Sequence, residues 1–479
     1  MESSLATLTI TEAAKKLAAK EITSLELCRA CLIEIEKNNK SLNAYLEVFA
    51  DVEEQAKAAD ARRAQDEREG NVSHPLLGIP VATKDNILIE GRHASSASKM
   101  LENYVASFDA TVITKLKAAG VVFMGRTNMD EFAMGGSTEN SAYGPTKNPF
   151  DHTRVAGGSS GGSAAALASG MALGTFGSDT GGSIREPASF CGLVGLKPTY
   201  GAVSRSGVMA MGSSLDQIGP FGRTVEDTEL LFDTIRGKDA LDGTSIDAGF
   251  YPKREPTKKI GVPRHLLANG VDQDVLAAFE ESLKVLQSQG YVAVDIELPS
   301  AGLALAIYYI IMPAESSTNL ARFDGVRYGL SIKGETLAED YAKSRGAGFG
   351  PEVRRRIMLG TYVLSSGYYD AYYGKATLAR EKLRKEYADV LATVDAVAVP
   401  TVPTPAFAIG EKAADPLSMY LADIFTVTAN LTGNPAISVP MGTVVRGDKT
   451  LPVGIQFTAA HGDEDTLFKL GKIATGESK

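Results

Sequence analysis

The sequence predicts an α/β fold for most of the chain. Its 479 residues are 44% hydrophobic and 22% charged, which is typical of a folded globular protein and not of a disordered one. From Leu76 onward, short apolar runs alternate with stretches of helical periodicity, as expected for strands followed by helices. Nearly half of the 48 glycines lie between residues 120 and 222. Such a concentration indicates tight turns or a close approach of the backbone to a ligand.

The first 70 residues predict helices. Thr23 and Glu26 have the spacing of a capping box, and Leu25, Leu27, Leu32 and Ile35 follow at roughly helical intervals. A second helix is expected from Asp51 to about Asp66, a stretch rich in Ala, Glu, Lys and Arg. We therefore expect residues 1–70 to form an N-terminal helical segment packed on the core.

The remaining residues predict one domain over 71–479. A helix is expected at 108–119 and a helical insertion at about 300–390. Apolar runs predict strands at 78–83, 121–124, 394–399, 436–439 and 453–457. Because strands occur near both ends of this region, we expect a single sheet that the last part of the chain completes.

Composition excludes several classes of protein. The 49 Lys and Arg are outnumbered by 58 Asp and Glu, for a net charge of −9, and nucleic-acid binding by this chain alone needs a basic face. A phosphate-binding loop motif is absent. The longest apolar run, Leu303–Pro313, is too short to span a bilayer, and the start of the chain lacks the pattern of a secretory signal. Three cysteines make neither a disulfide framework nor a four-ligand zinc site. We expect a cytoplasmic protein without a metal.

Two Gly/Ser-rich turns are the best candidates for chemistry. Residues 157–163 read GGSSGGS and run into a helix start, and 179–185 read DTGGSIR. Their separation suits neighbouring turns at the same end of a sheet. Lys84 follows a buried strand, where burial lowers the pKa of an amine. The residues thus allow Lys84 as base, one serine as relay and Ser183 as nucleophile, with backbone N–H groups beside its glycines for an oxyanion.

Other interpretations of these residues are open at this point. Residues 157–161 satisfy the G-x-S-x-G pattern of a nucleophile elbow, but a triad built on it needs a distant histidine, His265 or His461. Residues 96–99 read S-x-x-K without the partner motifs of a β-lactamase. On spacing alone, the two turns could equally be structural.

Residues 157–168, GGSSGGSAAALA, and 177–201, GSDTGGSIREPASFCGLVGLKPTYG, resemble the signature of the amidase family. The resemblance implies a large mixed β-sheet covered on both sides by helices, and a Ser–Ser–Lys triad. In this triad Lys84 is the general base, Ser159 the bridging serine, held on a cis peptide, and Ser183 the nucleophile. The implied oxyanion hole consists of the backbone N–H groups of Thr180, Gly181, Gly182 and Ser183.

Three further segments, 129–144, 322–328 and 365–373, resemble the A subunits of glutamine-dependent aminoacyl-tRNA amidotransferases. This resemblance extends over about residues 5–470. It implies a glutaminase that supplies ammonia for converting Glu-tRNA(Gln) to Gln-tRNA(Gln), and leaves open whether Asp-tRNA(Asn) is also served. The residues implied to hold glutamine are Tyr308, Arg356 and Asp423. Their chemistry fits, because an α-carboxylate favours Arg and an α-ammonium favours a carboxylate.

The same resemblance implies a heterotrimer. A B subunit uses ATP and Mg, binds the charged tRNA and receives the ammonia, and a small C subunit wraps the A–B contact. No cofactor is implied for this chain. Ala156 and Glu186 depart from the family pattern, which has Pro and Gln there. The alternative is a stand-alone amidase for another small amide, which has no reason to keep the three glutamine-holding residues.

Overall fold

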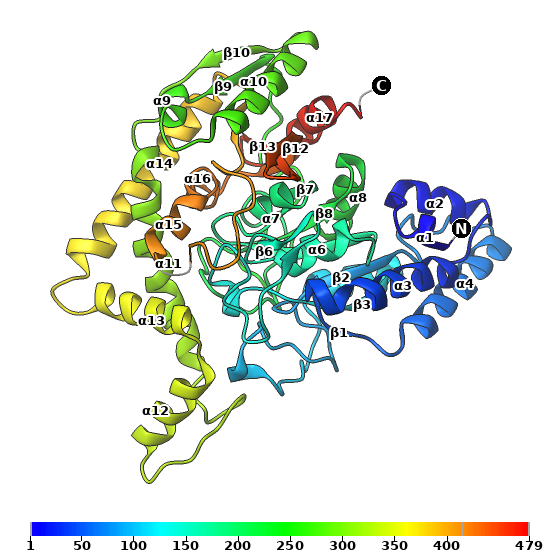
Figure 1. Ribbon diagram of the computed structural model, residues 1–479, viewed down its shortest axis with the longest axis horizontal. Helices are drawn as coiled ribbons and strands as arrows, with labels where there is room; N and C mark the ends of the chain where they lie inside the picture. The colour runs from blue at the N-terminus through cyan, green and yellow to red at the C-terminus, as the bar shows by residue number, and fades with distance from the viewer. Residues whose placement is uncertain (1, 413–414, 478–479) are drawn as a thin grey trace.

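An eleven-stranded mixed sheet runs through the protein (Figure 1). The computed structural model describes residues 2–412 and 415–477. Parallel pairs join β2 to both β3 and β6 and join β9 to β10 and β11, whereas the other pairs are antiparallel. The expected large mixed sheet is confirmed. Its strands lie in the order β1 (Tyr45–Val48), β3 (Val122–Thr127), β2 (Pro80–Lys84), β6 (Gly174–Asp179), β8 (Gln217–Gly222), β7 (Val194–Lys197), β12 (Ala436–Arg446), β13 (Lys449–Ala459), β11 (Ala396–Pro400), β9 (Lys259–Val262) and β10 (Val292–Asp295).

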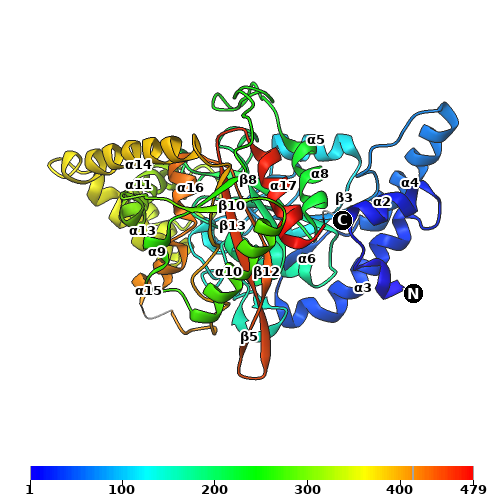
Figure 2. The same ribbon diagram turned by 90° about the horizontal axis from the view of Figure 1, so that it is seen from above.

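Helices cover both faces of the sheet, as strand β6 shows. The Thr175 hydroxyl donates to the Ser163 carbonyl in α6 (Gly161–Ala168), whereas a Cβ on Gly174 would touch Leu231 of α8 (Val225–Ile235). Because successive strand residues point to opposite faces, α6 and α8 lie on opposite sides. Helix α6 packs beside α7 (Arg185–Phe190), and α8 contacts α5 (Thr111–Ala119) and α17 (Glu464–Thr475), which contacts α10 (Gln273–Ser288) (Figure 2).

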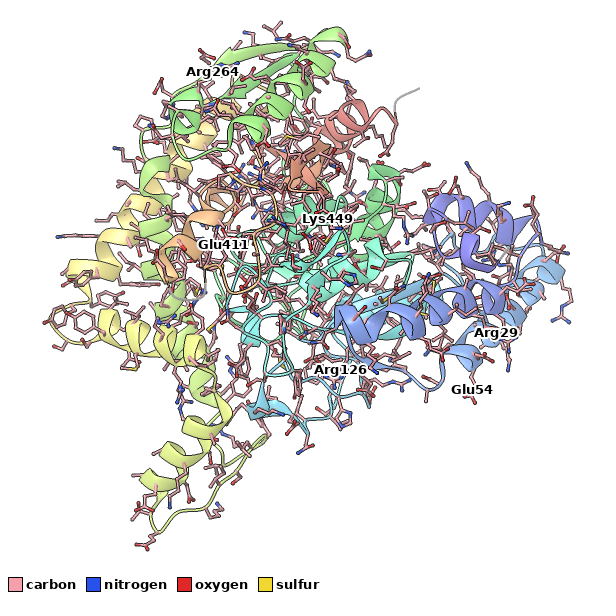
Figure 3. The ribbon with its side chains drawn as sticks, in the orientation of Figure 1. Arg29, Glu54, Arg126, Arg264, Glu411 and Lys449 are labelled. Carbon is pink, nitrogen blue, oxygen red and sulfur yellow. The ribbon has the colours of Figure 1, made fainter. Side chains whose placement is uncertain are left out.

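The N-terminal segment is mostly but not wholly helical. It contains α1 (Glu2–Leu5), α2 (Ile10–Ala18), α3 (Ser24–Leu42) and α4 (Val52–Glu69). The capping box of Thr23 and Glu26 is confirmed at the start of α3. Between α3 and α4, however, β1 pairs antiparallel with β3 and forms an edge of the sheet. Arg29 on α3 and Glu54 on α4 lie at the end of the molecule that these helices form (Figure 3), and the Arg29 guanidinium donates to Glu53 of α4.

Four helices occupy residues 300–390 and form a lobe at one end of the sheet (Figure 1). They are α11 (Ala304–Asn319), α12 (Leu337–Gly348), α13 (Pro351–Leu364) and α14 (Lys375–Leu391). Helix α11 packs on α13 and α14. Ile311, Val353 and Leu383 of the lobe belong to an apolar cluster that also includes Met129 and Val427 from outside it. The shorter elements are α9 (Arg264–Leu267), α15 (Pro416–Tyr420), α16 (Val427–Thr432), the small β4–β5 pair (Lys147–Asn148 and Asp151–Val155), a π-helical turn η5 (Asp370–Gly374) and 3-10 turns η1 (Lys99–Leu101), η2 (Glu131–Ala133), η3 (Ala301–Leu303), η4 (Leu320–Arg322) and η6 (Leu421–Asp423).

The last part of the chain completes the middle of the sheet, as predicted. Strands β12 and β13 form a hairpin, in which β12 pairs with β7 and β13 with β11. The hairpin therefore joins the strands that carry the Gly/Ser turns to the strands beside the helical lobe. No helix within the described residues is long and apolar enough to cross a membrane.

Candidate active site

Lys84 is the last residue of β2 and lies inside the protein. Its side chain is fully buried, and its Nζ lies 2.7 Å from Ser159 Oγ, 2.8 Å from Ser160 Oγ and 3.1 Å from the Ser178 carbonyl oxygen. Burial lowers the pKa of Lys84 to about 7, and three aspartates nearby oppose that shift only in part. A neutral amine that can accept a proton is therefore well populated at neutral pH.

The two Gly/Ser turns lie side by side. The Ser160 N–H donates to the Ser183 carbonyl over 3.2 Å, and the peptide bond between Gly158 and Ser159 is cis, the geometry that the resemblance implies. Ser159 is completely buried, whereas Ser183 is 7% exposed. The structure thus places Lys84, Ser159 and the Ser183 turn together, with Ser183 on the outer side. Sequence reasoning did not single out Ser160, although it is the next residue in the same turn.

The Ser183 turn offers fewer oxyanion donors than the four implied by the resemblance. The Gly182 N–H donates to the Asp179 carboxylate over 2.8 Å. For the N–H groups of Thr180, Gly181 and Ser183 the structure gives no acceptor among the described residues. Those three groups therefore remain available to an oxyanion, while the Gly182 N–H helps to shape the turn.

Glycine is required in this turn because other chain segments touch its backbone. A Cβ on Gly181 would lie 2.7 Å from the Tyr308 hydroxyl, and one on Gly182 would lie 2.4 Å from Thr426 Oγ1. Gly182 also has a φ of +140°, which L side chains disfavour. The turn is therefore clamped between α11 and the start of α16.

Asp179 and Arg185 hold the Ser183 turn in place through buried hydrogen bonds. The buried Arg185 guanidinium donates to both Asp179 oxygens, at 2.9 and 3.0 Å, and to Asn430, Gln456 and the Thr426 carbonyl. Burial alone raises the pKa of Asp179, but the charge and hydrogen bonds of Arg185 hold it at about 2. This network ties the turn to α16 and β13.

Asp130 anchors the other turn. Its N–H donates to the Ser159 carbonyl over 3.1 Å, and its carboxylate accepts from the N–H groups of Thr138, at 2.8 Å, and Asn140, at 3.0 Å. The Thr138 hydroxyl donates to the Gly157 carbonyl over 2.8 Å. In the sequence this segment stood out only by its resemblance to known proteins. Its Asp followed by Gly, Ser, Thr and Asn is nevertheless a signal for a carboxylate-centred turn.

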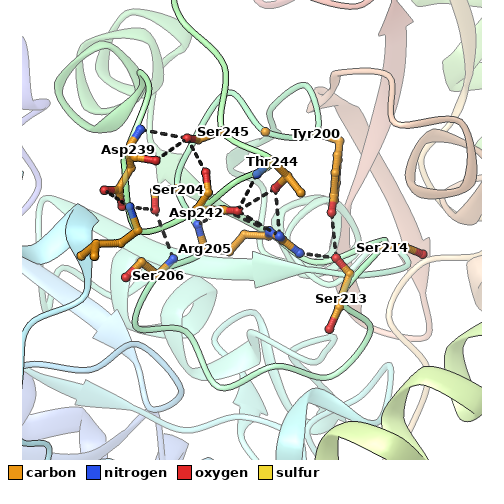
Figure 4. A network of polar contacts seen from close by, with 12 residues as sticks. Tyr200, Ser204, Arg205, Ser206, Ser213, Ser214, Asp239, Asp242, Thr244 and Ser245 are labelled. Atoms are coloured by element: carbon orange, nitrogen blue, oxygen red, sulfur yellow. Dashed lines mark hydrogen bonds and ion pairs between the residues drawn. The ribbon is translucent and has the colours of Figure 1, made fainter.

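The loop between β7 and β8 is ordered by a polar network (Figure 4). The Asp242 carboxylate accepts from the backbone N–H of Arg205 and from its guanidinium, and the same guanidinium donates to the Ser213 carbonyl. Three residues after Ser213, the Asp216 carboxylate accepts from the Thr180 hydroxyl over 2.7 Å. The hydrogen bond from Thr180 to Asp216 therefore links the Ser183 turn to this ordered loop.

The three residues implied to hold glutamine lie on one side of that turn. Tyr308, on α11, packs on Gly181. Arg356, on α13, lies 5.5 Å from the ring centroid of Tyr309, and the Tyr309 hydroxyl donates to Asp423 over 3.4 Å. The helical lobe and η6 thus bring the phenol of Tyr308, the guanidinium of Arg356 and the carboxyl of Asp423 to one side of the Ser183 turn. Sequence reasoning missed Tyr309.

Arg356 is already paired on one side. Its Nε donates to Glu352 over 2.7 Å, and the Tyr420 hydroxyl donates to the same Glu352 oxygen over 3.1 Å. The i, i+4 spacing of Glu352 and Arg356 on a helix was the signal for this pair. Beside it lies a cavity of about 460 Å³, lined in part by Gly135, Ser137, Arg356, Lys412, Met419 and Tyr420.

The alternative with a catalytic histidine has no support in this geometry. His265 lies 3.5 Å from Glu297, and His461 contacts the Thr432 carbonyl, whereas Ser159 contacts Lys84. Within the part of the chain that the structure describes, no group of three or more His, Cys, Asp or Glu is arranged to hold a metal ion.

The mixed α/β sheet carries a buried lysine beside two Gly/Ser turns. The chain belongs to the amidase family, whose model matches residues 26–468. It is 50% identical over 467 residues to the A subunit of the glutamyl-tRNA(Gln) amidotransferase of Carboxydothermus hydrogenoformans, covering 96% of this chain and 95% of that protein. The crystal structure of the protein of the same name from Thermotoga maritima matches with a TM-score of 0.79 and 42% identity, over 98% of this chain and 94% of that one. A native peptide amidase from Stenotrophomonas maltophilia matches with a TM-score of 0.79 and 26% identity, over 98% and 96%. Both resemblances stated from the sequence are confirmed.

We expect the Arg185–Asp179 pair to be essential for folding stability. Arg185→Ala should lower the free energy of unfolding by about 3–5 kcal/mol, because it leaves a buried carboxylate without its partner. Lys284→Ala is the matched control. Lys284 pairs with Glu281 at the surface, where the two side chains are 65% and 70% exposed, so its loss should cost no more than about 1 kcal/mol. Urea unfolding of both variants measures the difference, and equal losses would contradict the role given to Arg185.

Proposed function

We propose that the chain is the glutaminase subunit of an aminoacyl-tRNA amidotransferase, which hydrolyses glutamine to supply ammonia for converting Glu-tRNA(Gln) to Gln-tRNA(Gln). The observation that carries the proposal is the contact between Lys84 and Ser159 beside the Ser183 turn, with an arginine and a carboxyl on the substrate side. The names of the relatives at about half identity support the same activity. The same ammonia supply would also serve the conversion of Asp-tRNA(Asn) to Asn-tRNA(Asn).

In the proposed mechanism, neutral Lys84 takes the proton of Ser159 while Ser159 takes the proton of Ser183. The Ser183 oxygen then attacks the side-chain amide carbon of glutamine. The N–H groups of Thr180, Gly181 and Ser183 donate to the oxyanion that forms. The proton returns through Ser159 to the leaving nitrogen, ammonia departs, and water hydrolyses the ester to release glutamate.

Glutamine recognition in this proposal divides between two charges. The N–H groups of Arg356 that Glu352 does not use bind the α-carboxylate, and Asp423 binds the α-ammonium. Tyr308 and Tyr309 pack between them and the nucleophile turn. This arrangement selects an amino-acid amide, because an amide without the charged head makes no hydrogen bonds to the Arg356 N–H groups that Glu352 does not use, or to the Asp423 carboxyl, which accepts from the Tyr309 hydroxyl alone among the described residues.

The proposal places this chain in a heterotrimer with B and C subunits. The B subunit uses ATP and Mg and binds the charged tRNA, the C subunit wraps the contact between this chain and the B subunit, and the complex works in the cytoplasm. Support within this chain comes from exposed residues on α13 and in the segment between α13 and α14. Tyr362, Tyr368, Tyr369 and Tyr372 lie there with 40–47% of each exposed, and Met358 is 72% exposed. Aromatic residues and Met are enriched at protein interfaces.

We expect Arg356→Ala and Asp423→Ala to damage glutamine binding selectively. Loss of one partner of a charge-assisted pair costs roughly 1.5–3 kcal/mol, or about 10- to 150-fold in affinity. The measurement is ammonia release from glutamine and from a simple aliphatic amide without an amino-acid head. The simple amide should be nearly indifferent to both substitutions.

Ser183→Ala is the control for this experiment, because it should abolish release from both substrates. If Arg356→Ala and Asp423→Ala instead slow both amides equally, the two residues are structural and the glutaminase proposal loses its basis.

We expect the isolated chain to hydrolyse glutamine slowly and the complex to hydrolyse it faster. The glutamine contacts lie on α11, α13 and η6, whereas the nucleophile lies on the sheet, so a docked subunit can adjust their approach. A coupling of roughly 1–3 kcal/mol is typical of such linkage and corresponds to about 5- to 150-fold. The measurement is the rate at saturating glutamine, first for this chain and then with the B and C subunits, ATP and charged tRNA added in turn. Full activity of the isolated chain, unchanged by any addition, would favour a stand-alone amidase.

A further inference from the structure

Strands β6 and β8 bring Asp216 beside the Ser183 turn. The two strands pair antiparallel, and their last pair is Asp179 opposite Gln217. One step further in the same register, Thr180 of the turn comes opposite Asp216, which directly precedes β8. The Thr180 hydroxyl donates to the Asp216 carboxylate over 2.7 Å, and the two residues are only 1% and 4% exposed. The sheet register therefore builds a buried hydrogen bond between the start of β8 and the turn.

Two carboxylates hold the turn at its two ends. Asp179 accepts from the backbone N–H groups of Gly182, at 2.8 Å, and Ile184, at 3.2 Å, so it fixes the second half of the turn. Among the described residues, Thr180 makes one hydrogen bond, the one to Asp216. The Thr180 end of the turn is therefore held through Asp216.

The loop before β8 fixes Asp216 in turn. The Asp216 carboxylate accepts from the backbone N–H groups of Met211, at 2.9 Å, and Gly212, at 3.0 Å. A Cβ on Gly212 would lie 3.2 Å from Thr180 Cγ2, so the loop backbone also packs on the Thr180 side chain. The loop and the Thr180 end of the turn thus form one packed unit around a single carboxylate.

The same loop is tied to helix α11 of the lobe. The Ser214 N–H donates to the Glu315 carboxylate of α11 over 2.9 Å. Helix α11 also carries Tyr308, which packs on Gly181. The helix therefore meets the turn twice, directly at Gly181 and through the loop at Thr180.

The Asp216 carboxylate is charged at neutral pH without a cation beside it. Burial raises the pKa of Asp216 to about 6, although the hydrogen bonds from Thr180, Gly212 and Met211 oppose that shift. No Lys or Arg among the described residues forms an ion pair with it, so these three groups are its donors. Hydrogen bonds to an ionised acceptor are shorter and stronger than those between neutral groups, which makes Asp216 a firm anchor for the Thr180 hydroxyl.

We propose that Asp216 is a positioning residue for the oxyanion hole, which holds the N–H groups of Thr180 and Gly181 toward the oxyanion through the Thr180 hydroxyl. The inference rests on the proposed glutaminase function and deepens it. Thr180 lies between these two N–H groups, and glycine leaves the following backbone free to rotate, so anchoring the Thr180 side chain limits the rotation of both peptides. Asp216 therefore stabilises the charge that develops during the reaction, and leaves the binding of unreacted glutamine unchanged.

Thr180→Val tests this role on the full chain, because it removes the hydroxyl and keeps the shape of the side chain. The probe is 2-amino-4-boronobutanoate, in which boron takes the place of the amide carbon of glutamine. The Ser183 oxygen adds to the boron, its proton passes through Ser159 to Lys84, and one oxygen of the tetrahedral anion occupies the oxyanion hole. The Kd of this probe should rise roughly tenfold or more, since outright loss of one oxyanion donor costs about 10²–10³-fold in rate.

Two matched measurements separate this role from a merely structural one. Thr180→Ser keeps a hydroxyl for Asp216 and should restore the affinity for the boronate. Glutamine should bind with the same affinity to Ser183→Ala, which cannot turn it over, and to Ser183→Ala with Thr180→Val. Equal glutamine affinity also shows that the substrate site of the Val variant is intact.

An unchanged Kd of the boronate in Thr180→Val would overturn the role of Asp216, as would a Thr180→Ser variant that restores nothing. An equal loss of affinity for glutamine and for the boronate would also overturn it, because the hydroxyl would then support the whole site and not the oxyanion. If the unaltered chain neither binds the boronate nor releases ammonia from glutamine, the proposed glutaminase function itself fails, and this role with it.

Discussion

The burial of the Lys84 amine is the constraint on which the site depends. An amine at the end of a central strand cannot be left without partners, and here two serine hydroxyls and one carbonyl surround it. These groups come from the start of α6 and the end of β6, so satisfying the lysine fixes both Gly/Ser turns against β2. Because no carboxylate among the described residues touches the amine, burial prevails and its pKa falls to about 7.

The carboxyl groups near Lys84 accept hydrogen bonds from other groups. Asp130 closes the turn that carries Ser159, and Asp179 with Arg185 closes the turn that carries Ser183. Each acid is close enough to moderate the lysine charge yet is bound by other donors. The catalytic turns are therefore held by buried polar networks, which need every member satisfied.

Much of this could be predicted from local patterns. Alternating apolar runs and helices sufficed for an α/β fold, and the Gly/Ser turns with Lys84 pointed to the candidate site. The mixed sheet and the individual roles of Lys84, Ser159 and Ser183 came from the resemblance to the amidase family. Strand β1 was missed because four residues between two helices carry little periodicity. The pairing of Gly182 with Asp179 and of Arg356 with Glu352 was also missed. Whether a donor is free or occupied depends on the folded shape of a turn or a helix face, which residue types alone do not specify.

The most direct test of Lys84 as the base is its ionisation, followed by NMR in protein labelled with ¹³C and ¹⁵N at lysine. We predict that its Nζ titrates near pH 7. Lys197 is also buried, and burial together with the charge of Arg185 lowers its pKa to about 7, so Lys84→Met and Lys197→Met are needed to assign the two signals. A Lys84 amine that stays protonated to about pH 10, the usual value for lysine, would contradict this role, because it could not accept a proton from Ser159 at neutral pH.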